Sequence, residues 1–280
     1  MRVSCLLASL VALAGVSTGW SADLPAKNYT LGVLPYVSAT RLEPIYAPIS
    51  VEMSSALGRR VDFRTTTEDS LFYRKLEQQA YDFALVQPFW YPPAVDRFGY
   101  VPLVRFAEPL SAVVMVLADS PISSIDDLIG KTVATPPEIT PIAHMIRREL
   151  LERGIRPGED IELKAFRAID SCIQQVIIKA ASACVGPHFA PRMLETKLDI
   201  RLRTILETPG IPNFSILAHS RVPLEERRKI KEMLLSWGNG LSDKHLNLLQ
   251  RMNTRRLVPA IDTDYDVVRD FLRGTNINNN

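Results

Sequence analysis

The chain has 280 residues, with 33 basic and 31 acidic side chains, so its formal net charge at pH 7 is only +2. This near balance, without a basic cluster that alternates with aromatic residues, argues against nucleic-acid binding. Hydrophobic residues make up 46% of the chain, which is enough for one large α/β domain or two modest lobes.

The N-terminus has the three parts of a secretory signal peptide. Arg2 is the only charged residue before Asp23, an apolar run covers residues 5–16, and small or polar residues follow up to Ala22. This order is typical of an n-region, an h-region and a cleavage zone, and the run is too short to cross a bilayer. We therefore expect residues 1–22 to be removed on export. An uncleaved anchor is the alternative.

The first part of the mature chain alternates short apolar runs with amphipathic segments. Strands are predicted over residues 29–34, 61–65 and 83–86, and helices over residues 41–57 and 67–79. Ser38 and Thr40 are candidate N-caps of the first helix. The β-α-β-α-β order predicts a parallel sheet.

Three consecutive aromatic residues, Phe89, Trp90 and Tyr91, follow the third predicted strand, and Pro92 and Pro93 come directly after them. In open α/β sheets, ligands bind at the carboxyl ends of the strands. Aromatic rings placed there offer a large, rigid contact surface. We predict a proline-closed loop whose three rings contact a ligand. The alternative is a loop whose rings plug a core.

Five further side chains are candidates for ligand contact. Tyr36 and Ser38 follow the first predicted strand, at the same carboxyl edge. Thr140 opens a long helix later in the chain, and Asp170 and Ser171 precede the next helix. For Tyr36 the alternative is a cap on the lobe, and Asp170 and Ser171 could be N-caps that need no ligand.

The rest of the chain repeats the alternation of strands and helices. Strands are predicted over residues 100–106, 112–118, 132–134, 161–166, 183–185, 201–206 and 214–218, and helices over 122–130, 140–153, 172–180, 224–237 and 264–272. The pattern favours two α/β lobes joined by two crossing strands. Residues 23–112 and 214–280 would form the first lobe and residues 113–213 the second, with a ligand in the cleft between them.

Residues with distinctive chemistry are few. Cys172 and Cys184 remain after cleavage, and an exported protein could join them in a disulfide or keep two buried thiols. No histidine pairs with another histidine or a cysteine at metal-ligand spacing, so we predict no metal site and no cofactor. The nucleophile elbow, the P-loop and the metalloprotease helix are all missing, which argues against an enzyme.

Several segments, taken in order, resemble one protein family. They are residues 32–35, residues 56–58, residues 82–88 with Tyr91 and Ala94, residues 123–134 and residues 211–213. This order is similar to the phosphate/phosphite/phosphonate-binding proteins of ABC transporters, which are periplasmic solute-binding proteins with the two-lobed type II fold. The resemblance covers nearly all the mature chain. It implies a monomer that binds a small molecule, closes by hinge motion and is read by an ABC permease or the periplasmic domain of a sensor kinase.

The segment that grips the ligand in this family is altered here. The phosphonate binders carry a Ser-Thr-Ser-Gly-like loop at a helix start, where backbone and hydroxyl groups donate to the phosphonate oxygens. Residues 135–141 read Thr-Pro-Pro-Glu-Ile-Thr-Pro, so three amide donors are missing and a carboxylate is added at Glu138. The family's histidine before the next helix corresponds to Ile169, while its aromatic residue after the third strand is kept as Tyr91.

Four readings of the function follow. The resemblance implies a phosphorus oxyanion or organophosphonate as ligand, and the altered loop leaves another small metabolite as an alternative. An enzyme of the same fold would need a catalytic group near Glu138 or Asp170. An interaction module without a ligand would use residues 89–91 to dock on another protein.

Overall fold

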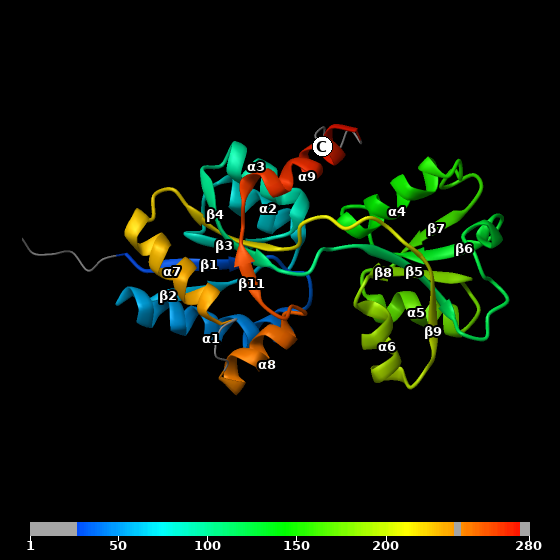
Figure 1. The fold of residues 1–280 in the computed structure, drawn as a ribbon, viewed down its shortest axis with the longest axis horizontal. Helices are drawn as coiled ribbons and strands as arrows, with labels where there is room; N and C mark the ends of the chain where they lie inside the picture. Colours follow the sequence, from blue (N-terminus) through cyan, green and yellow to red (C-terminus); the bar gives the residue numbers. More distant parts are fainter. Residues whose placement is uncertain (1–26, 238–241, 275–280) are drawn as a thin grey trace, which may run out of the picture.

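The computed structural model describes residues 27–237 and 242–274, which form two lobes side by side along the long axis of the molecule (Figure 1). This architecture confirms the predicted fold class of two α/β lobes. The predicted signal peptide, residues 1–22, lies outside the described residues.

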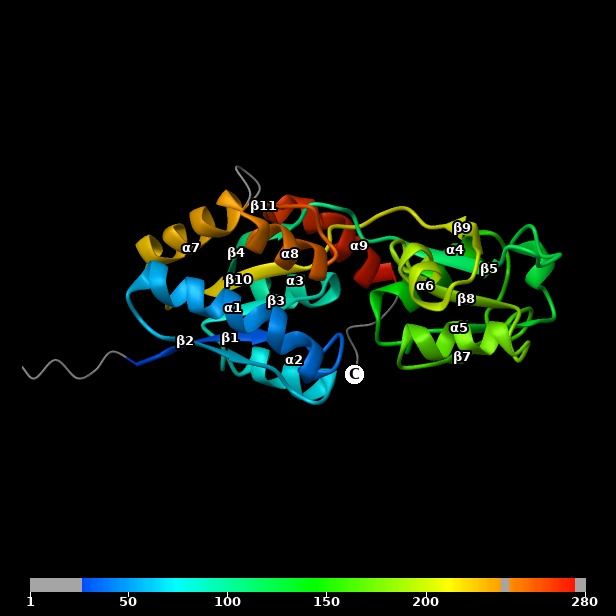
Figure 2. The same ribbon diagram turned by 90° about the horizontal axis from the view of Figure 1, so that it is seen from below.

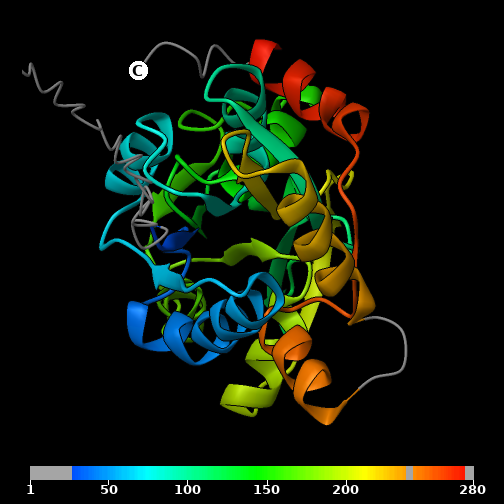
Figure 3. The same ribbon diagram turned by 90° about the vertical axis from the view of Figure 1, so that its left-hand side faces the viewer.

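Lobe 1 is built on a six-stranded sheet with the strand order β11-β4-β10-β3-β1-β2. Its strands are β1 (Tyr29–Val33), β2 (Val61–Arg64), β3 (Phe83–Val86), β4 (Tyr100–Phe106), β10 (Ser215–His219) and β11 (Leu257–Pro259). Its helices are α1 (Ala39–Leu57), α2 (Asp69–Glu77), α3 (Tyr91–Asp96), α7 (Leu224–Ser236), α8 (Asp243–Arg251) and α9 (Asp266–Gly274), with short 3₁₀ turns η1 (Pro88–Trp90) and η3 (Asp262–Tyr265). Helices α1, α7 and α8 cover one face of the sheet, and α2, α3 and α9 cover the other (Figures 1 and 3).

Lobe 2 is built on a five-stranded sheet with the order β7-β6-β8-β5-β9. Its strands are β5 (Ala112–Leu117), β6 (Thr132–Thr135), β7 (Glu162–Ala165), β8 (Ala183–Pro187) and β9 (Leu202–Glu207). Helix α4 (Pro141–Glu152) lies on one face, and α5 (Ile169–Ile177) and α6 (Ala190–Leu198) lie on the other (Figure 1). The helix predicted over residues 122–130 is only a 3₁₀ turn, η2 (Asp126–Leu128).

The strand directions bring the carboxyl ends of the two sheets to the same place. Strands β1, β3 and β4 run the same way, because β1 pairs parallel with β3 and β10 pairs antiparallel with both β3 and β4. Since β4 leads into lobe 2, all three end toward that lobe. Strand β5 leaves the crossing and pairs antiparallel with β8 and β9, and β6 is parallel to β8, so β6, β8 and β9 end toward lobe 1. The sheet of lobe 1 is therefore mixed, because the returning strand β10 inserts beside the predicted parallel strands.

Two chain segments cross between the lobes and pair with each other. The backbone N–H of Leu110 donates to the carbonyl of Ile211 at 2.8 Å, and Ile211 donates back at 2.9 Å. The side-chain amide of Asn213 donates to the carbonyl of Glu108 at 3.0 Å. The Glu108 carboxylate in turn accepts from the Thr254 hydroxyl at 2.6 Å and the Arg255 guanidinium at 2.8 Å. The crossing is thus a short two-stranded ribbon anchored to the segment before β11.

The structure joins Cys172 on α5 to Cys184 on β8, with their Cα atoms 5.6 Å apart. Both residues are at most 1% exposed and belong to a small apolar cluster between the lobe 2 sheet and the helices α5 and α6. The link fastens the helix that follows β7 to the central part of the sheet.

Removing this disulfide is expected to lower the stability of the oxidised protein. The bonded residues are 12 apart in sequence, and the entropy of closing this loop in the unfolded chain corresponds to about 3 kcal/mol of stability. Guanidinium unfolding of the wild type and of the Cys172→Ala/Cys184→Ala variant measures the difference. The expectation fails if the midpoints coincide under oxidising conditions.

Candidate functional site

Segments that follow parallel strands of both sheets meet on the face between the lobes. Residues 34–38 follow β1 and residues 87–91 follow β3 in lobe 1. From lobe 2 come residues 136–140 after β6, residues 166–168 after β7 and residues 188–189 after β8. All eight side chains predicted to contact a ligand lie in these segments or in the helix turns that directly follow them.

The segment after β1 offers one exposed and one packed side chain. Ser38 is exposed and occupies the N-cap position of α1, but it makes no side-chain cap bond to the helix and its hydroxyl lies 3.1 Å from that of Thr40. The Tyr36 hydroxyl bonds to that of Tyr46 at 3.0 Å, and its ring lies 5.4 Å from Phe214. Burial raises the pKa of Tyr36 above its usual value. Tyr36 is therefore held in place by lobe 1, whereas Ser38 is open to solvent.

The predicted aromatic loop is wrong in its conformation. Residues 88–90 form the 3₁₀ turn η1, and α3 begins at Tyr91. Prolines fit the first turn of a helix, because the N–H groups they lack have no partner inside the helix there. Pro88 and Pro92 therefore start helical turns instead of closing a loop.

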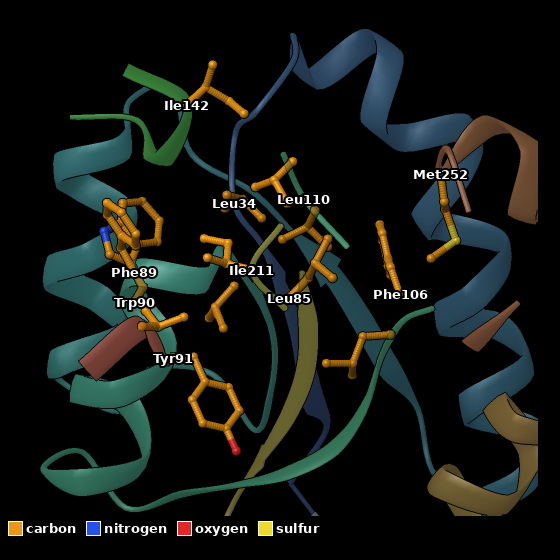
Figure 4. Packing of buried hydrophobic residues seen from close by; sticks show 14 of the residues in the cluster. Leu34, Leu85, Phe89, Trp90, Tyr91, Phe106, Leu110, Ile142, Ile211 and Met252 are labelled. Atoms are coloured by element: carbon orange, nitrogen blue, oxygen red, sulfur yellow. The ribbon is translucent and has the colours of Figure 1, made fainter. Parts of the chain in front are cut away.

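Trp90 and Tyr91 pack inside lobe 1 (Figure 4). The Tyr91 ring is fully buried and stacks on Tyr265, with centroids 3.5 Å apart and planes 6° from parallel. Trp90 lies 5.7 Å from Phe72 and 5.6 Å from Tyr73. This placement supports the alternative that the two rings fill a core. Ligand contact by them stays a prediction.

Phe89 is placed differently, because it reaches the other lobe. Its ring lies 5.6 Å from His144 on α4 and 5.2 Å from Phe271 on α9. The Arg148 guanidinium, also on α4, lies 5.0 Å from the centroid of Phe271. Ile142 at the start of α4 belongs to the same buried cluster as Phe89 (Figure 4). The lobes are therefore in direct contact through these side chains.

Thr140 lies at the start of α4, as predicted, and caps the helix together with the residues just before it. The Thr140 hydroxyl accepts from the backbone N–H of Ala143 at 3.4 Å and donates to the carbonyl of Pro137 at 2.8 Å. Glu138, in the segment before the helix, pairs with Arg147 on α4 at 2.5 Å, so its charge is balanced locally. This helix start already has donors and acceptors matched locally.

Asp170 and Ser171 lie inside α5, which corrects their prediction as N-caps. The helix begins at Ile169, and its N-cap is Ala168, whose side chain offers no acceptor. Asp170 pairs with Lys197 on α6 at 2.6 Å, and Ser171 is exposed. An acidic side chain in the first turn favours the helix through its dipole, which accounts for Asp170 without a cap bond.

Three of the four histidines in the described part of the chain have pKa values lowered by burial. Burial lowers the pKa values of His144, His188 and His219, and neighbouring Arg147 and Arg221 lower those of His144 and His219 further. These side chains therefore bind a proton less readily in the folded protein than in the unfolded chain, where they are protonated near pH 6.5.

We accordingly expect stability to fall as the pH drops below about 6.5, where the unfolded state binds more protons than the folded state. Melting temperatures at pH 7.5 and pH 5.5 test this, and the loss should shrink in His144→Gln. Equal melting temperatures at the two pH values would contradict the expectation. The carboxylates with lowered pKa values, such as Asp127 at about 2, act only at more acidic pH.

Two hollows of about 410 Å³ each flank the crossing segments and were not predicted from the sequence. One is lined by Ala107, Glu108, Pro109, Arg255 and Arg256, and the other by Glu108, Pro109, Ser111, His188, Glu207, Thr208 and Gly210. None of the predicted ligand contacts lines either hollow. A hollow beside a hinge is lined by residues from distant segments, which a single sequence does not bring together.

Among residues 27–237 and 242–274, no group of three or more His, Cys, Asp or Glu side chains is arranged to hold a metal ion. None of the helices in these ranges is both long and apolar enough to cross a membrane.

Comparison with known proteins gives one family and many similar folds. The family model described as "ABC transporter, phosphonate, periplasmic substrate-binding protein" matches residues 31–265. A search of curated proteins gives no match.

Among solved structures, the binding protein component of an ABC phosphonate transporter from Pseudomonas aeruginosa is 15% identical, with a TM-score of 0.72 over 90% of this chain and 88% of that one. PhnD1 from Prochlorococcus marinus, solved with methylphosphonate, is 15% identical, with a TM-score of 0.74 over 89% and 98%. The periplasmic aliphatic sulphonate binding protein SsuA from Escherichia coli is 12% identical, with a TM-score of 0.66 over 91% and 94%. At these identities the likeness concerns the fold.

Proposed function

The chain belongs to the family of phosphonate-binding periplasmic substrate-binding proteins of ABC transporters, and we propose that it captures a small oxyanion between its lobes and presents it to an ABC permease. The family is made of solute-binding transporter components and not of enzymes. The proposed ligand is a phosphonate, phosphite or phosphate, bound by a monomer. Presentation to a sensor kinase is the alternative for the partner.

The observation that supports an anion is the convergence of helix starts on the face between the lobes. Helices α1, α2 and α5 each follow a strand whose carboxyl end lies there. The N-cap side chains of all three make no hydrogen bond to the helix. The first N–H groups of a helix then remain available, and the helix dipole favours negative charge at this end. Three helix starts can thus replace the amide donors that the prolines of residues 136–141 remove.

Within this proposal, the exposed side chains Ser38 and Ser171 contact the ligand directly. Tyr36, Phe89 and Thr140 shape the site while held by their own neighbours. The Asp170 carboxylate stays paired with Lys197, so its negative charge is neutralised near the ligand.

A substitution by proline tests the backbone donors of α1. Ala39 is the first residue of the helix, and Ser38 before it has φ −59° and ψ 150°, which a following proline accepts. Ala39→Pro removes one N–H without breaking the helix. It should weaken oxyanion binding by about ten- to a hundredfold, because a hydrogen bond to a charged group contributes about 1.5–3 kcal/mol. The matched control is Leu224→Pro at the first position of α7, which follows Pro223 with a similar backbone and is 73% exposed.

Calorimetric titration of the mature protein with phosphate, phosphite, methylphosphonate and an alkanesulfonate gives the readout. Binding of a phosphorus oxyanion that Ala39→Pro weakens and Leu224→Pro leaves unchanged is the expected result. If only the alkanesulfonate binds, the ligand is a sulfonate and not a phosphorus oxyanion. If none of the four binds, the proposal is overturned.

A further inference from the structure

Helix α9 is attached to lobe 1 near the crossing segments and lies on the side of that lobe that faces α4 (Figures 1 and 2). Just before the helix, the Tyr265 hydroxyl donates to the carbonyl of Asn213 at 2.9 Å. One face of α9 is then buried through Val268, Phe271 and Leu272. The helix is thus fixed at its start to the second crossing segment and extends toward lobe 2.

Four side chains connect the lobes at this place, and we name them the interlobe latch: Phe89 and Phe271 from lobe 1, and His144 and Arg148 from α4. Phe89 lies between Phe271 at 5.2 Å and His144 at 5.6 Å, and the Arg148 guanidinium lies 5.0 Å from the Phe271 centroid. His144 and Arg148 are four residues apart and share one face of their helix. One face of α4 therefore meets one aromatic pair.

The latch depends on the lobes being together. Phe89 and Phe271 are each only 5% exposed in this arrangement. Separating the lobes would remove the ring and the cation that now cover them, and would return apolar surface to water. Contacts between aromatic rings and between a cation and a ring both favour the arrangement in which the lobes are together. None of the four side chains supplies the backbone donors proposed to hold the ligand.

We propose that the interlobe latch holds the lobes closed before any ligand binds and thereby sets the ligand affinity. The first half of this statement concerns the protein alone. The second half rests on the proposed function, since affinity scales with the fraction of molecules that are already in the binding conformation.

The test measures the separation of the lobes directly. Spin labels on Val51→Cys in α1 and Ile178→Cys after α5, which are 63% and 58% exposed, report the interlobe distance by double electron–electron resonance. The latch variant is His144→Ala/Arg148→Ala, which alters only the lobe 2 side of the contact. The matched control is Leu151→Ala, which is on the same helix and 55% exposed.

Without ligand, the unaltered chain should show mainly the short interlobe distance. The latch variant should raise the ratio of open to closed molecules by about tenfold, from two contacts of the sizes known for such pairs. Leu151→Ala should leave the ratio unchanged. Phe271→Leu, which keeps an apolar side chain in the core, should show part of the shift and guards against a folding defect.

Each result bears on one claim. A distance distribution that the latch variant leaves unaltered, with an unchanged melting temperature, would overturn the latch. An unaltered chain that is open without ligand would do the same. If the distribution shifts but phosphate and methylphosphonate bind neither form, the latch stands and the proposed function fails. If both hold, the affinity for the oxyanion should fall in the latch variant by up to the same factor as closure.

Discussion

Replacing Tyr91 by alanine is expected to lower the free energy of unfolding by about 3–5 kcal/mol, the range for removing a large aromatic side chain from a core. The ring is fully buried and stacked on Tyr265 at 3.5 Å. Tyr265 in turn donates to the carbonyl of Asn213 in the crossing segment. The cavity would therefore open beside the hinge, where few side chains could collapse to fill it. Guanidinium unfolding followed by tryptophan fluorescence measures the loss.

The phenylalanine variant separates the two roles proposed for this residue. The Tyr91 hydroxyl is buried and makes no well-formed hydrogen bond in the described part of the chain, although the Asp262 carboxylate lies near it. Burial and the nearby Asp262 carboxylate raise its pKa, so it is neutral. Tyr91→Phe should change stability by less than about 1 kcal/mol, because no made hydrogen bond is lost. A variant that folds normally but binds the ligand more weakly would show that the hydroxyl does contact it, as the sequence predicts.

Most of the fold could be predicted because central strands such as β3 and β5 are short apolar runs of their own, although the edge strand β11 was missed. Residues 29–34, 61–65 and 83–86 lie between helices with clear periodicity, and the three observed strands match them within two residues. Helix α6 was missed, because it is short and only Ala190 and Leu194 are buried. Helix α8 was also missed, although Ser242 caps it by accepting from His245 and could have marked its start.

The candidate site was harder to predict than the fold. Sequence shows that Tyr91 follows a strand, but the ring that covers it, Tyr265, comes from the last part of the chain. The same holds for Asp170, whose partner Lys197 lies on another helix. In the sequence, a polar or aromatic residue at the end of a strand looks the same whether its side chain can contact a ligand or is already packed or hydrogen-bonded inside the protein. Only the packing of distant segments decides which of them can meet a ligand.

The far end of lobe 1 carries a charged cluster that sequence analysis did not single out. The Asp82 carboxylate accepts from the Thr30 backbone N–H at 2.9 Å and from the Arg221 guanidinium at 2.8 Å. Arg221 also donates to the carbonyls of Gln79 and Tyr81, both at 2.7 Å. The cluster ties β1, β3 and the end of β10 together at the start of β3. This end of the strands points away from the face between the lobes.

Asp82→Ala is therefore expected to destabilise the protein by about 2–3 kcal/mol, because it leaves the Thr30 N–H without its acceptor and removes the carboxylate partner of Arg221, whose side chain is itself 39% exposed. The Asp82 side chain is only 12% exposed, so water cannot replace the lost bonds well. The control is Glu225→Ala, which breaks an exposed pair with Arg228 and should cost at most about 0.5 kcal/mol. Urea unfolding gives both values, and titration with the same ligands should show unchanged affinity in Asp82→Ala. A loss of affinity in a correctly folded variant would mean that strain at the far end of the sheet is transmitted to the face between the lobes. Equal stability of the two variants would show that the cluster contributes no more than a surface ion pair.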